Sequence, residues 1–201
     1  MPGAIPRGYC TQFVMNPLAE KVIRTDRLIL TPLKVGHAAA MFEGLRDADS
    51  YAFLPDIPFD DVAALAARYE RLQRGRSPDG REIWLNWVIG FADAPDLCGY
   101  VQFTVQPYAR RALVAYFVFA PYRQQGIARE AVVAALAEVI THFPLTHVDA
   151  EIDTRNAASI GLIERLGFVC QRLVRNADKF KGAVSDEVHY TFVVPASLPG
   201  V

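Results

Sequence analysis

Hydrophobic and polar positions along the chain follow two periods, and each period predicts one kind of element. Short apolar or alternating runs predict strands, and stretches with apolar residues at every third or fourth position predict helices. The predicted strands span residues 28–33, 82–92, 97–106, 112–119, 147–153, 168–174 and 187–194. The predicted helices span residues 37–46, 60–74, 127–142 and 157–166. The resulting order is β-α-α-β-β-β-α-β-α-β-β.

Turn residues set the connectivity of these strands. The linkers at 93–96 and 107–110 have the length and composition of hairpin loops, so the strands around them should form an antiparallel meander. The chain then continues as β-α-β, and we expect an α+β fold around one mixed sheet. No repeat or break in composition marks a second domain in 201 residues. We expect a single domain over 23–195, with an N-terminal arm at 1–22 and a C-terminal tail at 196–201.

Composition and charge exclude several classes of protein. Hydrophobic residues make up 52% of the chain and charged residues 21%, which excludes a disordered chain. The formal net charge of -1 provides no broad attraction for nucleic acid, so no nucleic-acid partner is expected. We recognise no secretory signal and no apolar run long enough to span a membrane, so we expect no membrane partner either.

Cysteine and histidine usage narrows the setting and the chemistry. Cys10, Cys98 and Cys170 are widely spaced and odd in number, which argues against a disulfide framework and favours a reducing, cytoplasmic location. We expect Cys98 and Cys170 to pack within strands as small hydrophobic residues. The four histidines have no ligand-like spacing, so no metal site is expected.

The segment from Tyr116 to Glu130 carries the clearest chemical signal. An apolar strand runs into a short polar loop, and Gly126 and Ala128 lie at the start of a helix. Small residues let a ligand approach the main chain, and the free amides and dipole of a helix start favour an anion such as a diphosphate. A plain connection between a strand and a helix would have the same features. The loop lacks G-K-S/T and G-x-G-x-x-G, which excludes a nucleoside triphosphatase loop and a dinucleotide fingerprint.

Four motifs together resemble one enzyme superfamily. Residues 123–128, Arg-Gln-Gln-Gly-Ile-Ala, match the R/Q-x-x-G-x-G/A acetyl-CoA motif of the GNAT acetyltransferases, and residues 156–168 resemble the N-x-x-S block and G-F ending of the RimJ/RimL-like branch. Residues 24–30 resemble the T-x-R-L-x-L opening of that branch, and residues 186–190 resemble its last strand. The motifs cover residues 24–194 in the correct order. The resemblance implies a GNAT-like acetyl-CoA N-acyltransferase fold.

The resemblance also implies how acetyl-CoA binds. In that family the pantetheine arm pairs with the main chain of a strand, which corresponds here to Phe117, Val118 and Phe119. The pyrophosphate rests on loop amides, which correspond to Gln124, Gln125, Gly126, Ile127, Ala128 and Arg129. Arg123 and Arg129 could add positive charge, or they could be exposed arginines that flank a helix. Asn156 could bond the cofactor arm, with helix capping as an equal alternative.

Acetyl transfer needs a neutral amine, and the sequence offers candidates for the proton transfers. At neutral pH a lysine amine must lose a proton at about 4 to 5 kcal/mol, whereas an α-amine needs about 1 kcal/mol. Alternation along 147–153 places Glu151 opposite the apolar face, and its position matches the proton-accepting glutamate of some relatives. We predict that Glu151 is the base, acting through water, with a solvated surface carboxylate as the alternative.

Ser159 is the candidate that protonates or hydrogen-bonds the leaving sulfur, with a backbone-bonded serine at a helix start as the alternative. Many relatives carry a tyrosine acid four residues later, where this chain has Ile163. Tyr116 is expected in the core or lining the substrate pocket.

Two segments are expected to border the acceptor. The connection between the first two helices is acidic, which would favour a cationic amine or a basic peptide, although a solvated loop with a helix cap explains it too. Its carboxylates are Asp47, Asp49, Asp56, Asp60 and Asp61. Residues 176–186 are expected to form a mobile lip on the other side. Four aromatic residues could line the pocket or fill the core, namely Tyr51, Phe53, Trp84 and Trp87.

Three functions remain open at this point. The leading prediction is transfer of an acetyl group from acetyl-CoA to a protein or peptide N-terminal α-amine, by direct attack in a ternary complex of a monomer or homodimer. The second is acetylation of a small amine such as an antibiotic, a polyamine or an amino acid. The third is a non-catalytic acyl-CoA sensor, since the tyrosine acid of many relatives is missing.

Overall fold

The computed structural model describes residues 16–196. The first 15 residues of the predicted arm, Cys10 among them, and residues 197–201 of the predicted tail lie outside the described residues. Residues 16–22 are described, and the Leu18 side chain is buried against the core.

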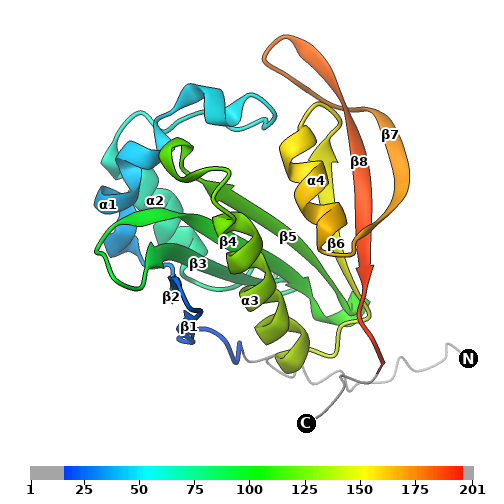
Figure 1. Ribbon diagram of the computed structural model, residues 1–201, viewed down its shortest axis with the longest axis horizontal. Coiled ribbons are helices and arrows are strands. Elements are labelled where there is room, and N and C mark those ends of the chain that lie inside the picture. Colours follow the sequence, from blue (N-terminus) through cyan, green and yellow to red (C-terminus); the bar gives the residue numbers. More distant parts are fainter. Residues whose placement is uncertain (1–15, 197–201) are drawn as a thin grey trace, which may run out of the picture.

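One mixed sheet forms the centre of the molecule (Figure 1). Within residues 16–196 it has eight strands in the order β1-β2-β3-β4-β5-β6-β8-β7. They are β1 (Ile23–Arg24), β2 (Leu28–Pro32), β3 (Ile83–Phe91), β4 (Leu97–Gln106), β5 (Arg111–Val118), β6 (His147–Asp153), β7 (Val169–Phe180) and β8 (Ala183–Val193). Strands β3, β4 and β5 form the predicted antiparallel meander, and the predicted α+β class is confirmed.

Helices pack on both faces of the sheet. α3 (Ile127–His142) and α4 (Ala157–Arg165) cover one face, over a core that includes Val114 and Val148. α1 (Ala38–Phe42) and α2 (Val62–Leu72) cover the other, over a smaller core that includes Phe117. Because side chains alternate along β5, its even-numbered residues face α3 and α4 and its odd-numbered residues face α1 and α2.

The predicted helix at 37–46 is only partly α-helical. α1 is five residues long and lies between two 3-10 turns, η1 (Val35–His37) and η2 (Glu43–Leu45). Gly44 in η2 is a weak helix former, and the ring of Phe119 packs directly on it. A Cβ atom on Gly44 would lie 2.2 Å from Cδ2 of Phe119. Tertiary packing at Gly44 is therefore tight.

The predicted lip at 176–186 is a β-hairpin and not an irregular connection between two strands. β7 and β8 run through it as a hairpin that turns at Lys181 and Gly182. Both turn residues have positive φ, 51° and 77°, which is the conformation of a two-residue hairpin turn. The charged residues before the turn are accommodated because β7 is an edge strand with one side in solvent.

The sheet opens between β5 and β6, the one parallel pair within the described strands. These strands pair only from Arg111 to Leu113 and from His147 to Asp149, and then diverge. Figure 1 shows β5 turning away from β6 toward the upper half of the molecule. We call the space between the diverging strands the opening.

Candidate active site

The edge of β5 that faces the opening has main-chain groups without a strand partner. The Phe119 amide donates to the Cys98 carbonyl on β4 at 2.9 Å, so by alternation the main chain of Phe117 also points toward β4. The main-chain groups of Tyr116 and Val118 therefore point into the opening. Of the three predicted pairing residues, only Val118 presents its main chain there, and its carbonyl already accepts from Nε of Arg123 at 3.1 Å. An extended ligand can add to this edge as a strand does.

The loop after β5 ends in an exposed turn at the start of α3. It begins with η5 (Ala120–Tyr122), and Gln124 and Gly126 have φ angles of 60° and 78°. The first bond of α3 runs from the Glu130 amide to the Gly126 carbonyl at 3.0 Å, so the preceding amides have no helical acceptor. A Cβ atom on Gly126 would meet one heavy atom within 4 Å, Nη2 of Arg27 at 3.5 Å. Open, unpaired amides at a helix start fit a diphosphate.

The two predicted loop arginines are placed differently. Arg123 hydrogen-bonds the hydroxyl of Ser50, and its Nη2 lies 4.0 Å from Oδ2 of Asp47. It therefore ties the loop to the segment between α1 and α2, residues 46–61, which we call the connector. Arg129 is exposed on the first turn of α3. Gln125 is also exposed, and its side-chain amide donates to the Pro121 carbonyl at 3.0 Å.

Ser159 pairs with a residue of β5 across the opening. Its Oγ lies 2.6 Å from Oη of Tyr116, and its amide donates to Oδ1 of Asn156 at 3.1 Å. Asn156 therefore caps α4, and Tyr116 reaches toward the helix. Burial raises the pKa of Tyr116 to about 12, against the opposing effect of the Ser159 hydrogen bond. Tyr116 is thus a neutral hydrogen-bond donor at physiological pH.

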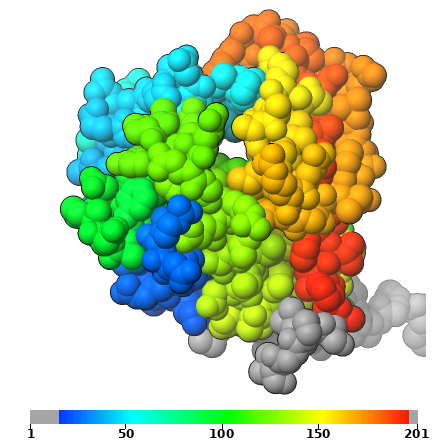
Figure 2. Space-filling view, in the orientation of Figure 1, coloured from blue at the N-terminus to red at the C-terminus, as the bar shows by residue number. Residues whose placement is uncertain are grey.

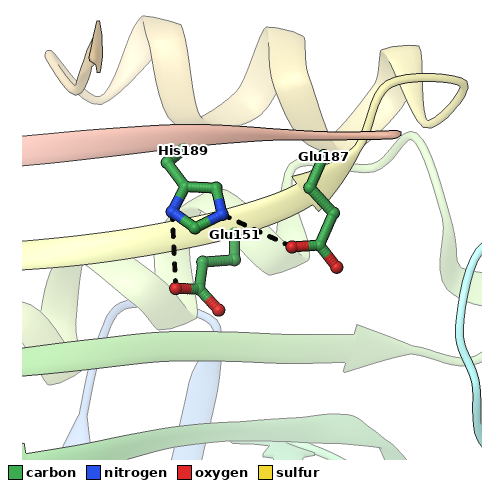
Figure 3. Close-up of side chains that lie close together, drawn as sticks. All are labelled: Glu151, Glu187 and His189. Atoms are coloured by element: carbon green, nitrogen blue, oxygen red, sulfur yellow. Dashed lines mark ion pairs between the residues drawn. The ribbon is translucent and has the colours of Figure 1, made fainter. Parts of the chain in front are cut away.

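Glu151 lies on the other face of the sheet, in a cluster that extends onto β8 (Figure 3). The alternation predicted for β6 is confirmed, because Ala150 and Ile152 are buried while Glu151 is exposed. His189 pairs with Glu151 across the strands, and Glu187 lies two residues from His189 on the same face. Oε1 of Glu151 is 3.5 Å from Nδ1 of His189, and Oε2 of Glu187 is 3.4 Å from Nε2.

This cluster has the residue types of a metal site, which the histidine spacing did not predict. Its ligand atoms lie within 4.8 Å of one another. The two ring nitrogens of His189 nevertheless face different carboxylates, so the ring bridges Glu151 and Glu187 and does not converge with them on one point. Nη2 of Arg172 also lies 3.4 Å from Nδ1 of the ring. Glu187 and His189 are two residues apart on one strand and so share a face, a signal that sequence reasoning missed.

The connector and the β7–β8 hairpin meet beside the opening. Nζ of Lys181 donates to the main-chain carbonyls of Tyr51 and Leu54, the latter at 3.0 Å. The guanidinium of Arg155 lies 5.8 Å from the ring of Phe53 and 5.9 Å from that of Phe180. Figure 2 shows a hollow between the connector (cyan), the loop after β5 (green) and α4 (yellow).

Several predicted acceptor residues have structural roles. Asp47 caps η3 (Ala48–Tyr51), and Asp61 caps α2 by accepting from the Ala64 amide at 2.7 Å. The Trp87 and Tyr51 side chains are buried in the core. Trp84 is half-buried on β3, where its Nε1 donates to Glu82 at 3.0 Å. Phe53 is the predicted aromatic residue that lies near Arg155, which also lies near Phe180 of the hairpin. Cys98 is buried as predicted, but Cys170 is exposed because β7 is an edge strand.

Asp153 ends β6 with a strong local network. It accepts two hydrogen bonds from the Arg155 guanidinium, at 2.9 and 2.5 Å, and one from the Ser185 hydroxyl at 2.6 Å. The Arg155 hydrogen bonds lower the pKa of Asp153 to about 2, against the opposing effect of burial. The network holds the Arg155 guanidinium near the rings of Phe53 and Phe180.

The comparisons with known proteins identify the family. The model of the acetyltransferase (GNAT) domain matches residues 27–169, which is more than half of the chain. The chain therefore belongs to the GNAT acetyltransferase family. It is an N-acetyltransferase that uses acetyl-CoA as its cosubstrate.

Relatives and solved structures agree with this family. The uncharacterized N-acetyltransferase p20 of Bacillus licheniformis is 23% identical over 167 residues, 83% of this chain and 92% of that protein. RimL, a ribosomal L7/L12 alpha-N-protein acetyltransferase solved with coenzyme A, has a TM-score of 0.78 at 17% identity, covering 88% of this chain and all of that one. The microcin C7 self immunity acetyltransferase MccE, solved with acetyl-CoA and AMP, has a TM-score of 0.75 at 16% identity, covering 85% and 94%. These two structures share the fold of this chain.

Among residues 16–196, no helix has both the length and the apolar character that crossing a bilayer requires.

Proposed function

We propose that the protein acetylates the N-terminal α-amine of a protein or peptide by direct transfer from acetyl-CoA. The observation that carries this proposal is the opening between β5 and β6, where features from both faces of the sheet meet. The edge of β5 and the amides at 124–129 supply one side, together with the Tyr116–Ser159 pair. Glu151 supplies a carboxylate on the opposite face, where an amine can enter without crossing the cofactor.

In this proposal each residue has one task. Glu151 takes the proton from the acceptor ammonium, directly or through a water molecule. The His189 ring lies beside the Glu151 carboxylate. The neutral amine forms the new bond from nitrogen to the acetyl carbon while the bond from that carbon to sulfur breaks. The second proton of that nitrogen passes to water or to the leaving thiolate, so the products are the amide and coenzyme A. A β5 amide that points into the opening stabilises negative charge on the acetyl oxygen. No covalent bond to the protein forms.

The sulfur leaves as a thiolate, and the Tyr116–Ser159 pair would hold it by hydrogen bonds. A free thiol has a pKa of about 8.5, well below that of Tyr116, so full proton transfer from the tyrosine is unfavourable. Hydrogen bonding alone still favours departure, since a charge-assisted bond is stronger than a neutral one. Ser159 is in this account a hydrogen-bond partner of the leaving group, and Asn156 fixes the start of the helix that carries it.

An α-amine is favoured over a lysine amine as the acceptor, because removing its proton costs less free energy and the candidate base is an exposed carboxylate. The pKa of an α-amine is about 8 and that of a lysine amine about 10.4, so the α-amine asks less of a candidate base whose side chain is 47% exposed. RimL, whose fold this chain shares, is described as an alpha-N-protein acetyltransferase, which supports the same choice. A small amine is the second candidate, because Lys181 joins the hairpin to the connector and narrows the approach for a bulky acceptor.

Release of free thiol from acetyl-CoA tests the proposal. The protein would be incubated with acetyl-CoA and, in separate reactions, peptides with free N-termini, peptides blocked at the N-terminus that contain lysine, and small polyamines, antibiotics and amino acids. The proposal predicts the fastest release with free peptide N-termini. Faster release with small amines would establish the second candidate, and cofactor binding without any release would indicate a sensor.

A substitution at Gly126 tests the placement of the cofactor. Gly126→Glu brings a side chain and a negative charge to the exposed amides, so we expect the Kd for acetyl-CoA to rise more than about 100-fold. Gly80→Glu is the matched control. Gly80 has a φ of 71° and lies in the turn before β3, and a Cβ atom there would meet no heavy atom within 4 Å. Equal affinity of the two variants in calorimetry would refute the assignment.

A further inference from the structure

The T-x-R-L motif at residues 25–28 has no role in the proposed chemistry, yet it contacts the start of α3. Oγ1 of Thr25 donates to Oε1 of Glu130 at 2.5 Å, and Nε of Arg27 donates to Oε2 at 2.7 Å. Nη2 of Arg27 lies 2.5 Å from the same Oε2. Thr25, Arg27 and Glu130 thus form a compact group, which we call the brace.

Arg27 also orients the main chain of the loop. Its Nη1 donates to the Gln125 carbonyl at 3.2 Å. In a trans peptide the carbonyl and the following amide point in opposite directions, and no peptide bond is cis within the described residues. The Gly126 amide is therefore directed away from Arg27, toward the exposed side of the loop.

The charge of Glu130 makes the brace more than a packing contact. Glu130 lies in the first turn of α3. A carboxylate there interacts favourably with the positive end of the helix dipole, but it competes with an anionic ligand for that same end. Partial burial acts to raise its pKa, but the Thr25 and Arg27 hydrogen bonds outweigh this and keep that pKa below its usual value. Glu130 is therefore ionised, and the adjacent guanidinium neutralises it.

We propose that Arg27 is a positioning residue for acetyl-CoA, which neutralises Glu130 and directs the Gly126 amide toward the diphosphate. This inference rests on the proposed placement of the diphosphate at residues 124–129. Arg27 acts through Glu130 and the loop in this proposal, and it does not act by touching the acetyl group or the amine.

The test is a double-mutant cycle on acetyl-CoA binding, measured by calorimetry. An uncompensated carboxylate near a diphosphate should raise the Kd about tenfold in Arg27→Ala. Glu130→Gln should leave the Kd within about twofold of wild type, and the double variant should recover most of the loss. Arg24→Ala is the matched control, because Arg24 is exposed on β1 and its loss removes the same charge from the chain.

A second readout separates the brace from general damage to the fold. Acetyl-pantetheine lacks the diphosphate, so its KM as a donor should be the same for wild type and Arg27→Ala. An Arg27→Ala Kd equal to that of wild type would overturn the proposal, as would a double variant as weak as Arg27→Ala. If Gly126→Glu and wild type bind acetyl-CoA equally, the placement of the diphosphate fails first, and the brace fails with it.

Discussion

Replacing Glu151 by Gln removes the proposed base and keeps its shape, and its effect should depend on pH. An α-amine with a pKa of about 8 is about 10% neutral at pH 7 and about 1% neutral at pH 6. A positioned base contributes about 100-fold to 10,000-fold to the rate. Because the Glu151 side chain is 47% exposed, we expect the lower end, a fall in kcat of about 100-fold at pH 6 to 7. Above about pH 9 the amine is already neutral, so the loss should shrink below about fivefold.

The assay is thiol release from acetyl-CoA at saturating peptide, measured from pH 6 to 9.5 for wild type and Glu151→Gln. Glu187→Gln is a useful comparison, because Glu187 faces the other nitrogen of His189 and lies two residues before it on β8, opposite Asp153 and not opposite Glu151. It should lose less than about fivefold at any pH. Parallel pH profiles for wild type and Glu151→Gln, or equal losses for the two glutamates, would refute the assignment of Glu151 as the base.

Two other substitutions test the neighbouring segments. Lys181→Ala removes the hydrogen bonds to the Tyr51 and Leu54 carbonyls. The KM for the amine, measured from initial rates, should change by at least about fivefold, while the Kd for acetyl-CoA stays constant. An unchanged KM would show that the hairpin does not shape the acceptor site. Asp153→Asn removes a carboxylate whose pKa is about 2 in the folded protein and 3.8 in the unfolded chain. The free energy of unfolding should therefore fall by about 2 kcal/mol above pH 4, and this loss should vanish as the pH falls toward 2. Urea unfolding at pH 7 and pH 3 measures this difference, and an equal loss at both pH values would contradict the ion-pair explanation.

Local patterns were sufficient for elements whose signals lie within a few residues. The strand at 147–153 and the helix after Gly126 have the predicted bounds, because each is apolar in its own period and ends at a clear breaker such as Pro144. The segment at 37–46 was less regular than predicted, since Gly44 accommodates the distant ring of Phe119. The hairpin at 176–186 was missed because charged residues on an edge strand look like a loop.

The candidate site shows the same division between local and distant signals. The loop at 123–128 was visible as a motif, and the alternation along β6 placed Glu151 on its face. The divergence of β5 and β6 depends on pairing between segments more than 30 residues apart, and no pattern along one strand reports it. The pairs of Tyr116 with Ser159, Glu151 with His189, and Arg27 with Glu130 likewise follow from tertiary structure alone.

A crystal structure of the protein with acetyl-CoA would test the central claim most directly. The account predicts a diphosphate within hydrogen-bond distance of the amides of residues 124–129 and an extended arm along the edge of β5 at Tyr116 and Val118, with the sulfur beside the Tyr116–Ser159 pair. A cofactor bound elsewhere, with the loop amides turned away from it, would contradict the account.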